Sequence, residues 1–116
     1  MDISKIQKQL SNFASERDWE QFHSPKNLSM ALSVEASELV EIFQWLNLEE
    51  SNFPDQKQIA SIRSEVADIA MYLIRFCDVL EINLEEAIEE KIIENGNKYP
   101  VELSKGSSKK YNQRDA

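Results

Sequence analysis

Residues 59–80 read IASIRSEVADIAMYLIRFCDVL, and this stretch decides the fold. Its apolar side chains recur at alternating steps of three and four residues, which is the spacing of one face of an α-helix. They are Ile59, Ile62, Val66, Ile69, Leu73, Phe76 and Leu80. A second row at the same spacing, here called the polar ridge, consists of Ser61, Glu65, Asp68, Tyr72 and Arg75. The stretch therefore predicts a long helix whose apolar seam packs against other helices in a bundle.

Three more helices are predicted around this one. The apolar pattern of the first continues to about Arg17. Ser24-Pro25 begins the second, because serine caps a helix and proline is tolerated at its first position. Asn83 begins the last helix, which Tyr99-Pro100 ends.

The composition favours an all-α fold. The chain has two glycines and three prolines, so turn signals are few, and no repeated alternation of β-branched residues indicates a sheet. One of the prolines lies in a polar connection, residues 47–57, between the second and third helices. We predict a four-helix bundle over residues 1–100 and a basic, flexible tail over residues 101–116. One chain of 116 residues is small for enclosing a large pocket, which favours assembly with further copies.

The acidic charge restricts the partners. The chain has a formal net charge of −8 at pH 7, and its acids are concentrated in residues 1–100. Such a surface repels a nucleic-acid backbone, so we expect no nucleic-acid partner. No apolar run is long enough to cross a membrane, residues 1–23 lack a secretion signal, and Cys77 has no partner for an internal disulfide. We expect a cytoplasmic protein with no membrane partner.

Two acidic pairs are the strongest sign of chemistry. Residues 32–39 read LSVEASEL, in which Glu35 interrupts the apolar stripe and Glu38 follows one turn later. Glu65 and Asp68 repeat this spacing on the long helix. Packing the two helices together gathers four carboxylates in a half-buried seam, which is unfavourable without protons or a cation. The pattern predicts a metal site formed by Glu35, Glu38, Glu65 and Asp68.

An all-carboxylate site favours a hard cation, Mg²⁺ or else Mn²⁺, which often shares its coordination with phosphates. Zinc is disfavoured because the chain has one cysteine and one histidine, and a di-iron centre because His23 lies outside both acidic pairs. Glu35 and Glu38 are the candidate catalytic carboxylates, and the choice of general base between Glu38 and Glu41 stays open. Candidates for binding the outer phosphates are Tyr72, Arg75, Lys91 and Asn95.

Residues 17–23 read RDWEQFH and have no helical stripe of their own. Taken alone, Trp19 and Phe22 are expected to close the end of the bundle, because aromatic residues in a connection near a core usually contribute packing. His23 is then a polar residue with a satisfied hydrogen bond.

Several segments nevertheless resemble the all-α nucleotide pyrophosphohydrolases of the MazG-like superfamily. The two acidic pairs, Glu35-x-x-Glu38 and Glu65-x-x-Asp68, look like the metal-binding signature of that superfamily. Other segments are similar to its dCTP pyrophosphatase branch: residues 17–23, FQW at 43–45, DIAMYL at 68–73 and NGNKYPV at 95–101. The resemblance covers nearly the whole chain, and the aromatic segments make it more specific than the acids alone.

This resemblance implies a Mg²⁺-dependent enzyme that hydrolyses a nucleoside triphosphate, of the dCTP or modified dCTP type, to the monophosphate and pyrophosphate. It implies that Trp19 and Trp45 sandwich the base and that His23 lines the same pocket. The residues implied to approach the phosphates are Tyr72, Lys91, Asn95 and Lys98. It also implies a dimer or a dimer of dimers, with sites completed across subunits.

Two other functions stay open on the residues alone. One is a non-catalytic helical module that binds a nucleotide or another helix, which predicts binding without turnover. The other is a structural bundle whose acids are simply solvated, which predicts no saturable binding of Mg²⁺ and a non-hydrolysable triphosphate.

Overall fold

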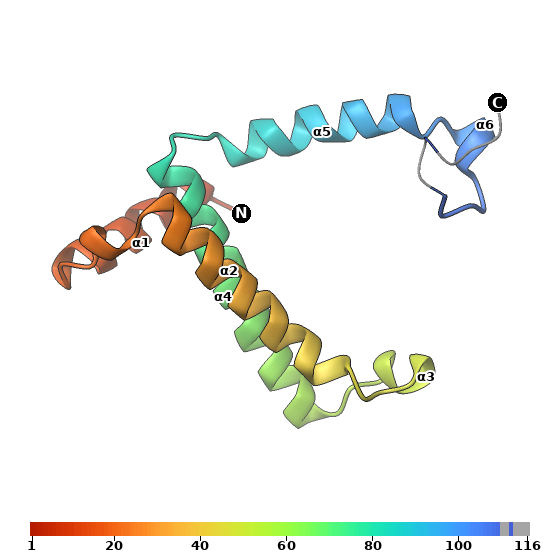
Figure 1. The fold of residues 1–116 in the computed structure, drawn as a ribbon, viewed down its shortest axis with the longest axis horizontal. Helices are drawn as coiled ribbons and strands as arrows, with labels where there is room; N and C mark the ends of the chain where they lie inside the picture. Colours follow the sequence, from red (N-terminus) through yellow and green to blue (C-terminus); the bar gives the residue numbers. More distant parts are fainter. Residues whose placement is uncertain (110–111, 113–116) are drawn as a thin grey trace. The chain divides into compact units, whose positions relative to one another are not determined.

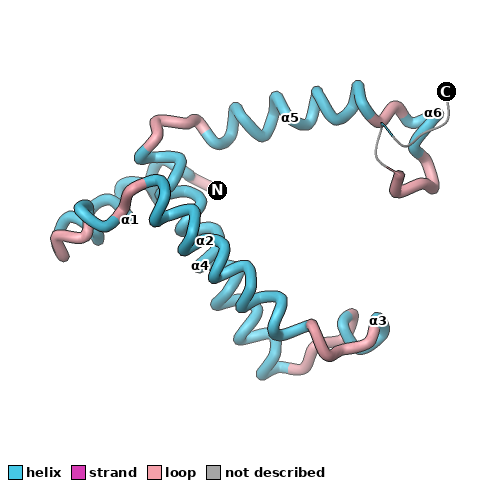
Figure 2. Tube along the Cα trace, viewed as in Figure 1, coloured by secondary structure: helices cyan, strands magenta, loops and turns pink. Residues whose placement is uncertain are grey.

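The computed structural model describes residues 1–109 and residue 112, and every regular element among them is a helix. The elements are α1 (Ile3–Glu16), the 3-10 helix η1 (Glu20–Phe22), α2 (Pro25–Phe43), α3 (Leu48–Ser51), α4 (Gln56–Val79), α5 (Leu84–Lys98) and α6 (Val101–Ser104). The prediction of an all-α fold is confirmed (Figure 2). The chain divides into two compact units, Met1–Ile82 and Asn83–Ala116.

The first unit is organised by α2 and α4, which pack side by side along their length, while α1 contacts α4 (Figure 1). Its most buried side chains are those of Ala14, Leu28, Ile74 and Cys77. Cys77 is therefore a small core residue, as the sequence indicates. This packing places the two acidic pairs on neighbouring helices.

The predicted capping residues begin the helices. Asp2, Ser24 and Asn83 each accept a hydrogen bond from the backbone N–H three residues later. Asp55 does the same for α4. The Gln58 side chain in turn accepts a hydrogen bond from the Asp55 backbone N–H, which completes a capping box. These caps satisfy backbone donors that a helix leaves unpaired at its start, and they fix where α2 and α4 begin.

Two helices end on a left-handed residue that is not glycine. After α1, Asp18 has a φ of 55°, and Trp19 N–H donates to Ala14 O at 2.9 Å. After α4, Glu81 has a φ of 57°, and Ile82 N–H donates to Cys77 O at 2.8 Å. Both turns have the hydrogen bonds of a Schellman motif, in which glycine is the usual left-handed residue. The first of them turns the chain so that Trp19 returns toward the bundle.

The second unit contains α5 and α6. Three of the four long helices predicted for the bundle thus lie in the first unit, and α5 belongs to the other. The predicted tail, residues 101–116, begins with the single turn of α6. Its basic residues Lys110 and Arg114 lie outside the described residues. Within the described part of the chain, no helix has the length and apolar character to cross a membrane.

Candidate metal centre and aromatic pocket

The carboxylates of Glu35, Glu38 and Glu65 converge between α2 and α4. Each offers one oxygen, and these oxygens all lie within 4.8 Å of one another. The three side chains are half-buried. This three-glutamate cluster forms where the sequence predicts it, because α2 and α4 pack together and bring their acidic turns face to face.

Crowding changes the protonation of the cluster. The pKa of Glu35 is raised from 4.5 to about 7, chiefly because its protonated form hydrogen-bonds to Glu65, and further by burial and by the carboxylates of Glu38 and Asp68. The pKa of Glu65 is also raised: the hydrogen bond from Glu35 lowers it, but burial and the charges of Glu38 and Asp68 outweigh that effect. Near neutral pH Glu35 is therefore still partly protonated, whereas an isolated glutamate is ionised.

The donor set fits a hard cation. Ionised carboxylates only accept hydrogen bonds, and the Oε2 atoms of Glu35 and Glu65 are buried with no hydrogen-bond partner among the described residues. A buried acceptor without a donor is unfavourable unless a proton or an ion satisfies it. Three convergent oxygen ligands without histidine or cysteine match the preference of Mg²⁺ or Mn²⁺.

Asp68, the fourth predicted ligand, is placed differently from the three glutamates. It is not one of the residues whose oxygens converge within 4.8 Å, but its charge still raises the pKa of both Glu35 and Glu65. Its side chain also lines the neighbouring aromatic pocket. Asp68 thus lies between the cluster and that pocket, and its role as a metal ligand stays a prediction.

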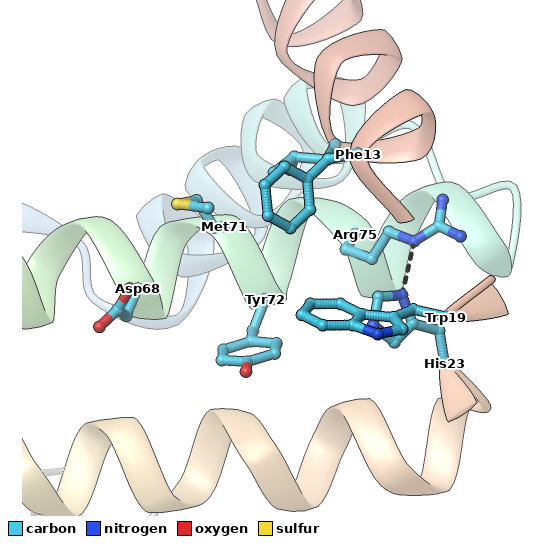
Figure 3. Close-up of a pocket in the computed structure, with 8 residues that line it drawn as sticks. Phe13, Trp19, His23, Asp68, Met71, Tyr72 and Arg75 are labelled. Atoms are coloured by element: carbon cyan, nitrogen blue, oxygen red, sulfur yellow. Dashed lines mark hydrogen bonds between the residues drawn. The ribbon is translucent and has the colours of Figure 1, made fainter. Parts of the chain in front are cut away.

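Two cavities border the polar ridge of α4. One, of about 370 Å³, is open and is lined by Ile42 and Ser61 together with Glu38, Glu41 and Glu65. The other, of about 120 Å³, is the aromatic pocket (Figure 3). Its lining residues are Leu10, Phe13, Trp19, His23, Asp68, Met71, Tyr72 and Arg75. The ridge therefore joins an acidic cavity to an aromatic one within about four helical turns.

In the aromatic pocket, Trp19 packs edge-on against two rings. Its ring centroid lies 5.7 Å from that of Phe13 and 6.5 Å from that of His23, with interplanar angles of 68° and 64°. Trp19 still exposes 43% of its surface, so it is not a plug sealed within the core. It lines the pocket together with Tyr72 and His23, and its role in binding a base stays a prediction (Figure 3).

His23 accepts a hydrogen bond from Arg75, whose Nε lies 3.2 Å from His23 Nδ1. Arg75 also donates from Nη1 to Asp78 Oδ2 at 3.3 Å. From the sequence Arg75 was a candidate for binding phosphate, but here its guanidinium group is engaged by His23 and Asp78 at the wall of the aromatic pocket. The sequence separation of 52 positions between Arg75 and His23 explains why local spacing gave no signal of this contact.

The remaining predicted residues are not among those that line this pocket. Trp45 follows the carboxyl end of α2 and is 87% exposed. Lys91, Asn95 and Lys98 lie on α5 in the second unit, where both lysines pair with Glu94, at 3.3 and 3.0 Å. Lys98 and Lys91 together lower the pKa of Glu94. The structure groups these three on one helix, and their contact with phosphates stays a prediction.

Sequence reasoning missed the residues that complete the wall of the aromatic pocket. Leu10 and Phe13 belong to the first apolar stripe, and Met71 lies beside the ridge. An apolar residue on a helical stripe looks the same whether it packs in a core or lines a cavity. The geometry of α1 against α4 was needed to separate the two cases.

This fold and this arrangement of carboxylates define a recognised class, and the chain belongs to the MazG-like family, whose model matches residues 30–113. The matched segment contains the three-glutamate cluster and Asp68. The predicted resemblance to this family is therefore confirmed.

Individual relatives point to one branch of the family. The chain is 39% identical to dCTP pyrophosphatase 1 of Mus musculus over 112 residues, covering 94% of this chain and 65% of the mouse protein. It is 35% identical to dCTP pyrophosphatase 1 of Homo sapiens over 113 residues, covering 96% of this chain and 66% of the human protein. The chain thus spans slightly less than two thirds of the length of these relatives. A crystal structure of a pyrophosphatase from Archaeoglobus fulgidus superposes with a TM-score of 0.80 at 37% identity, covering 86% of this chain and 94% of that one.

Proposed function

We propose that this protein is a Mg²⁺-dependent nucleoside triphosphate pyrophosphohydrolase that acts on dCTP or a modified dCTP. One observation carries the proposal. In a cluster of three glutamates, two buried carboxylate oxygens have no hydrogen-bond partner among the described residues, and Asp68, one turn after Glu65 on α4, lines an aromatic pocket. The similarity to dCTP pyrophosphatase 1 supports the choice of base. Removing unwanted nucleotides from the cellular pool is the corresponding role.

In this proposal, Glu35, Glu38, Glu65 and Asp68 hold the metal ion. When bound, Mg²⁺ supplies neutralisation of the phosphate oxygens and a polarised water. The chain supplies the rest of the chemistry. Glu38 lies in both the cluster and the acidic cavity, and Glu41 lines the same cavity. Either carboxylate is placed to accept the proton of the attacking water, and Glu38 is the nearer to the other ligands.

The reaction breaks the bond that bridges the α and β phosphates. The water oxygen forms a new bond to phosphorus, the bridging oxygen leaves with the other phosphate group, and the carboxylate takes the water proton. The products are the nucleoside monophosphate and pyrophosphate. Tyr72 lies on the polar ridge, where it lines the aromatic pocket, and it is proposed to contact the phosphates, with Lys91, Asn95 and Lys98 as further donors.

The proposed stacking of the base on Trp19 and Trp45 requires a second chain. Trp19 precedes α2 and Trp45 follows it, and a helix of 19 residues is about 28 Å long. One protomer therefore cannot close both tryptophans on a single base. Exposed apolar side chains on α2 and α4, among them Val34, Val40 and Val66, support burial against another copy. We propose a dimer or a dimer of dimers in the cytoplasm, in which the partner contributes Trp45.

The proposed function is tested by the identity of the product. Purified protein incubated with Mg²⁺ and a panel of triphosphates is expected to release pyrophosphate, most rapidly from dCTP or its 5-substituted forms, and EDTA is expected to stop the reaction. Ion-exchange separation of radiolabelled products distinguishes pyrophosphate from orthophosphate. Orthophosphate as the first product would reject the proposal, and saturable nucleotide binding without turnover would favour the non-catalytic module.

The shared site is tested by mixing two impaired variants. Trp45→Ala is expected to raise KM for the nucleotide roughly tenfold or more through lost stacking, and Glu38→Gln is expected to be inactive. After the two are dissociated and reassembled together, activity at low substrate is expected to recover, because a mixed assembly contains one site with both native residues.

Trp19→Ala mixed with Glu38→Gln provides the matched control. Trp19 lines a pocket with Asp68 of its own chain, so its site is that of the same protomer's cluster. This mixture is expected to show no recovery. Equal recovery in both mixtures, or in neither, would contradict a Trp45 contributed by the partner.

A further inference from the structure

Arg75 is a mostly covered cation with a definite orientation. Its side chain is 11% exposed, and its Nη1 is held at 3.3 Å by Asp78 Oδ2, one turn further along α4. Its Nε points at His23 Nδ1, 3.2 Å away, on the segment that joins η1 to α2 (Figure 3). Two fixed partners on one planar guanidinium group define its position and its direction.

This contact dictates the protonation of His23. A guanidinium group only donates hydrogen bonds, so Nδ1 must accept and carries no proton. The ring proton of the neutral imidazole is then on Nε2, and no described residue hydrogen-bonds to that atom. Burial and the charge of Arg75 lower the pKa of His23, while Glu20 on η1 acts in the opposite direction. The imidazole is therefore neutral at pH 7.

We propose that Arg75, anchored by Asp78, is a positioning residue that holds His23 as an Nε2–H donor facing the aromatic pocket, where it selects a base bearing a carbonyl oxygen. This inference rests on the proposed function and deepens it by assigning a recognition element.

The other polar groups of the pocket narrow the ligand further. Asp68 offers a carboxylate and Tyr72 a hydroxyl group on the same wall. With Asp68 assigned to the metal and Tyr72 to the phosphates, the donor fixed at His23 is the polar group left to recognise the base, and it suits a flat base that carries a carbonyl oxygen. Adenine has no carbonyl oxygen and leaves the His23 donor without its preferred acceptor, and a buried donor left unpaired weakens binding.

The histidine arm of the test does not depend on catalysis. His23 is the single histidine of the chain, so ¹⁵N-histidine labelling gives one unambiguous set of imidazole signals. In the native protein we expect an Nε2–H imidazole whose midpoint of titration lies below that of a free histidine. In Arg75→Met the midpoint is expected to move to higher pH and Nδ1 to lose its hydrogen-bonded shift, while Arg63→Met, an exposed arginine on the same helix, leaves both unchanged.

The kinetic arm asks whether Arg75 acts through His23. Arg75→Met is expected to raise KM for dCTP about 3- to 10-fold with little change in kcat, as expected for one hydrogen bond to an uncharged group. His23→Phe is expected to raise KM similarly. In the double variant the two effects are expected not to add, because the second residue works only through the first. Arg75→Lys, which keeps a charged donor, is expected to restore part of the lost binding and keeps the test informative if Arg75→Met folds poorly.

Each of the following results would overturn a specific part of the proposal. An unchanged His23 titration in Arg75→Met overturns the proposal, whatever the activity. Additive effects of Arg75→Met and His23→Phe overturn it too, because Arg75 then contacts the ligand directly. Equal losses for dCTP and dATP reject the assigned selectivity. If no triphosphate is hydrolysed by the native protein, the proposed function fails while the histidine signals still report on Arg75.

Discussion

Replacing Glu38 with glutamine is expected to reduce pyrophosphate release about a thousandfold or more while the helical circular-dichroism spectrum stays unchanged. Glu38 belongs to the three-glutamate cluster and lines the acidic cavity together with Glu41 and Glu65. The amide keeps the shape of the side chain but is a poor ligand for a cation and a poor proton acceptor. Loss of a general base or of a metal-held nucleophile typically lowers rates by factors of hundreds to tens of thousands.

Two companion variants make this experiment decisive. Glu49→Gln removes an exposed carboxylate from α3 and is expected to keep native turnover, which controls for the change in net charge. Glu41→Gln separates the two candidates for the general base: retained turnover assigns the proton transfer to Glu38, and a collapse equal to that of Glu38→Gln assigns an essential role to Glu41. Full activity of Glu38→Gln would exclude an essential role for this cluster residue.

Mg²⁺ affinity is expected to rise about tenfold per pH unit up to a pH near 7 and then to level off. The metal-free cluster holds a proton on Glu35, whose pKa is about 7, and a divalent cation must displace it. Titration calorimetry with Mg²⁺ in buffers of different ionisation enthalpy counts the released protons. A release of about one proton below pH 7 and almost none above pH 8 is the expected result.

The same group sets the stability of the metal-free protein in the opposite direction. Because the folded pKa of Glu35 lies above its unfolded value of 4.5, the folded state binds more protons between these two limits. Its contribution to the free energy of unfolding is fully present below about pH 4.5 and is lost as the pH rises through 7. In EDTA, Tm is expected to fall over this range on account of Glu35, and Glu35→Gln is expected to flatten the fall. If neither the Mg²⁺ affinity nor the Tm changed with pH, the raised pKa of Glu35 would be contradicted.

The sequence predicted the helices well because apolar periodicity and capping residues are local signals. Ser24 and Asn83 cap the helices they were expected to begin. The short helix α3 was missed within the polar connection 47–57, because its four residues are too few for a periodic pattern and only the capping box of Asn47 with Glu50 marks it. The left-handed turns were missed because Asp18 and Glu81 stand where glycine is usual.

The candidate site could be predicted where a charged residue interrupts an apolar helical pattern. Glu35 in an apolar stripe signalled the cluster before any geometry was known. The core was less predictable: Val66 belongs to the apolar seam but is 50% exposed, whereas Ile74 and Cys77, one position off that seam, are buried. Some residues of the apolar seam pack inside the protomer and others stay exposed, and a single sequence does not show which residues do which. The contact of Arg75 with His23 was likewise out of reach, because it joins distant segments.

The single helix α4 carries Ser61 and Glu65 on the wall of one cavity and Asp68, Tyr72 and Arg75 on the wall of the other. Its uninterrupted backbone fixes the distance between these residues, because each residue advances the helix axis by about 1.5 Å and no loop intervenes. The distance along α4 between the proposed metal site and the proposed base pocket is thus hard to alter by point substitution. If the proposed function holds, adaptation to a larger or smaller base is expected to come from the opposite wall, where Phe13 lies on α1 and Trp19 and His23 flank η1.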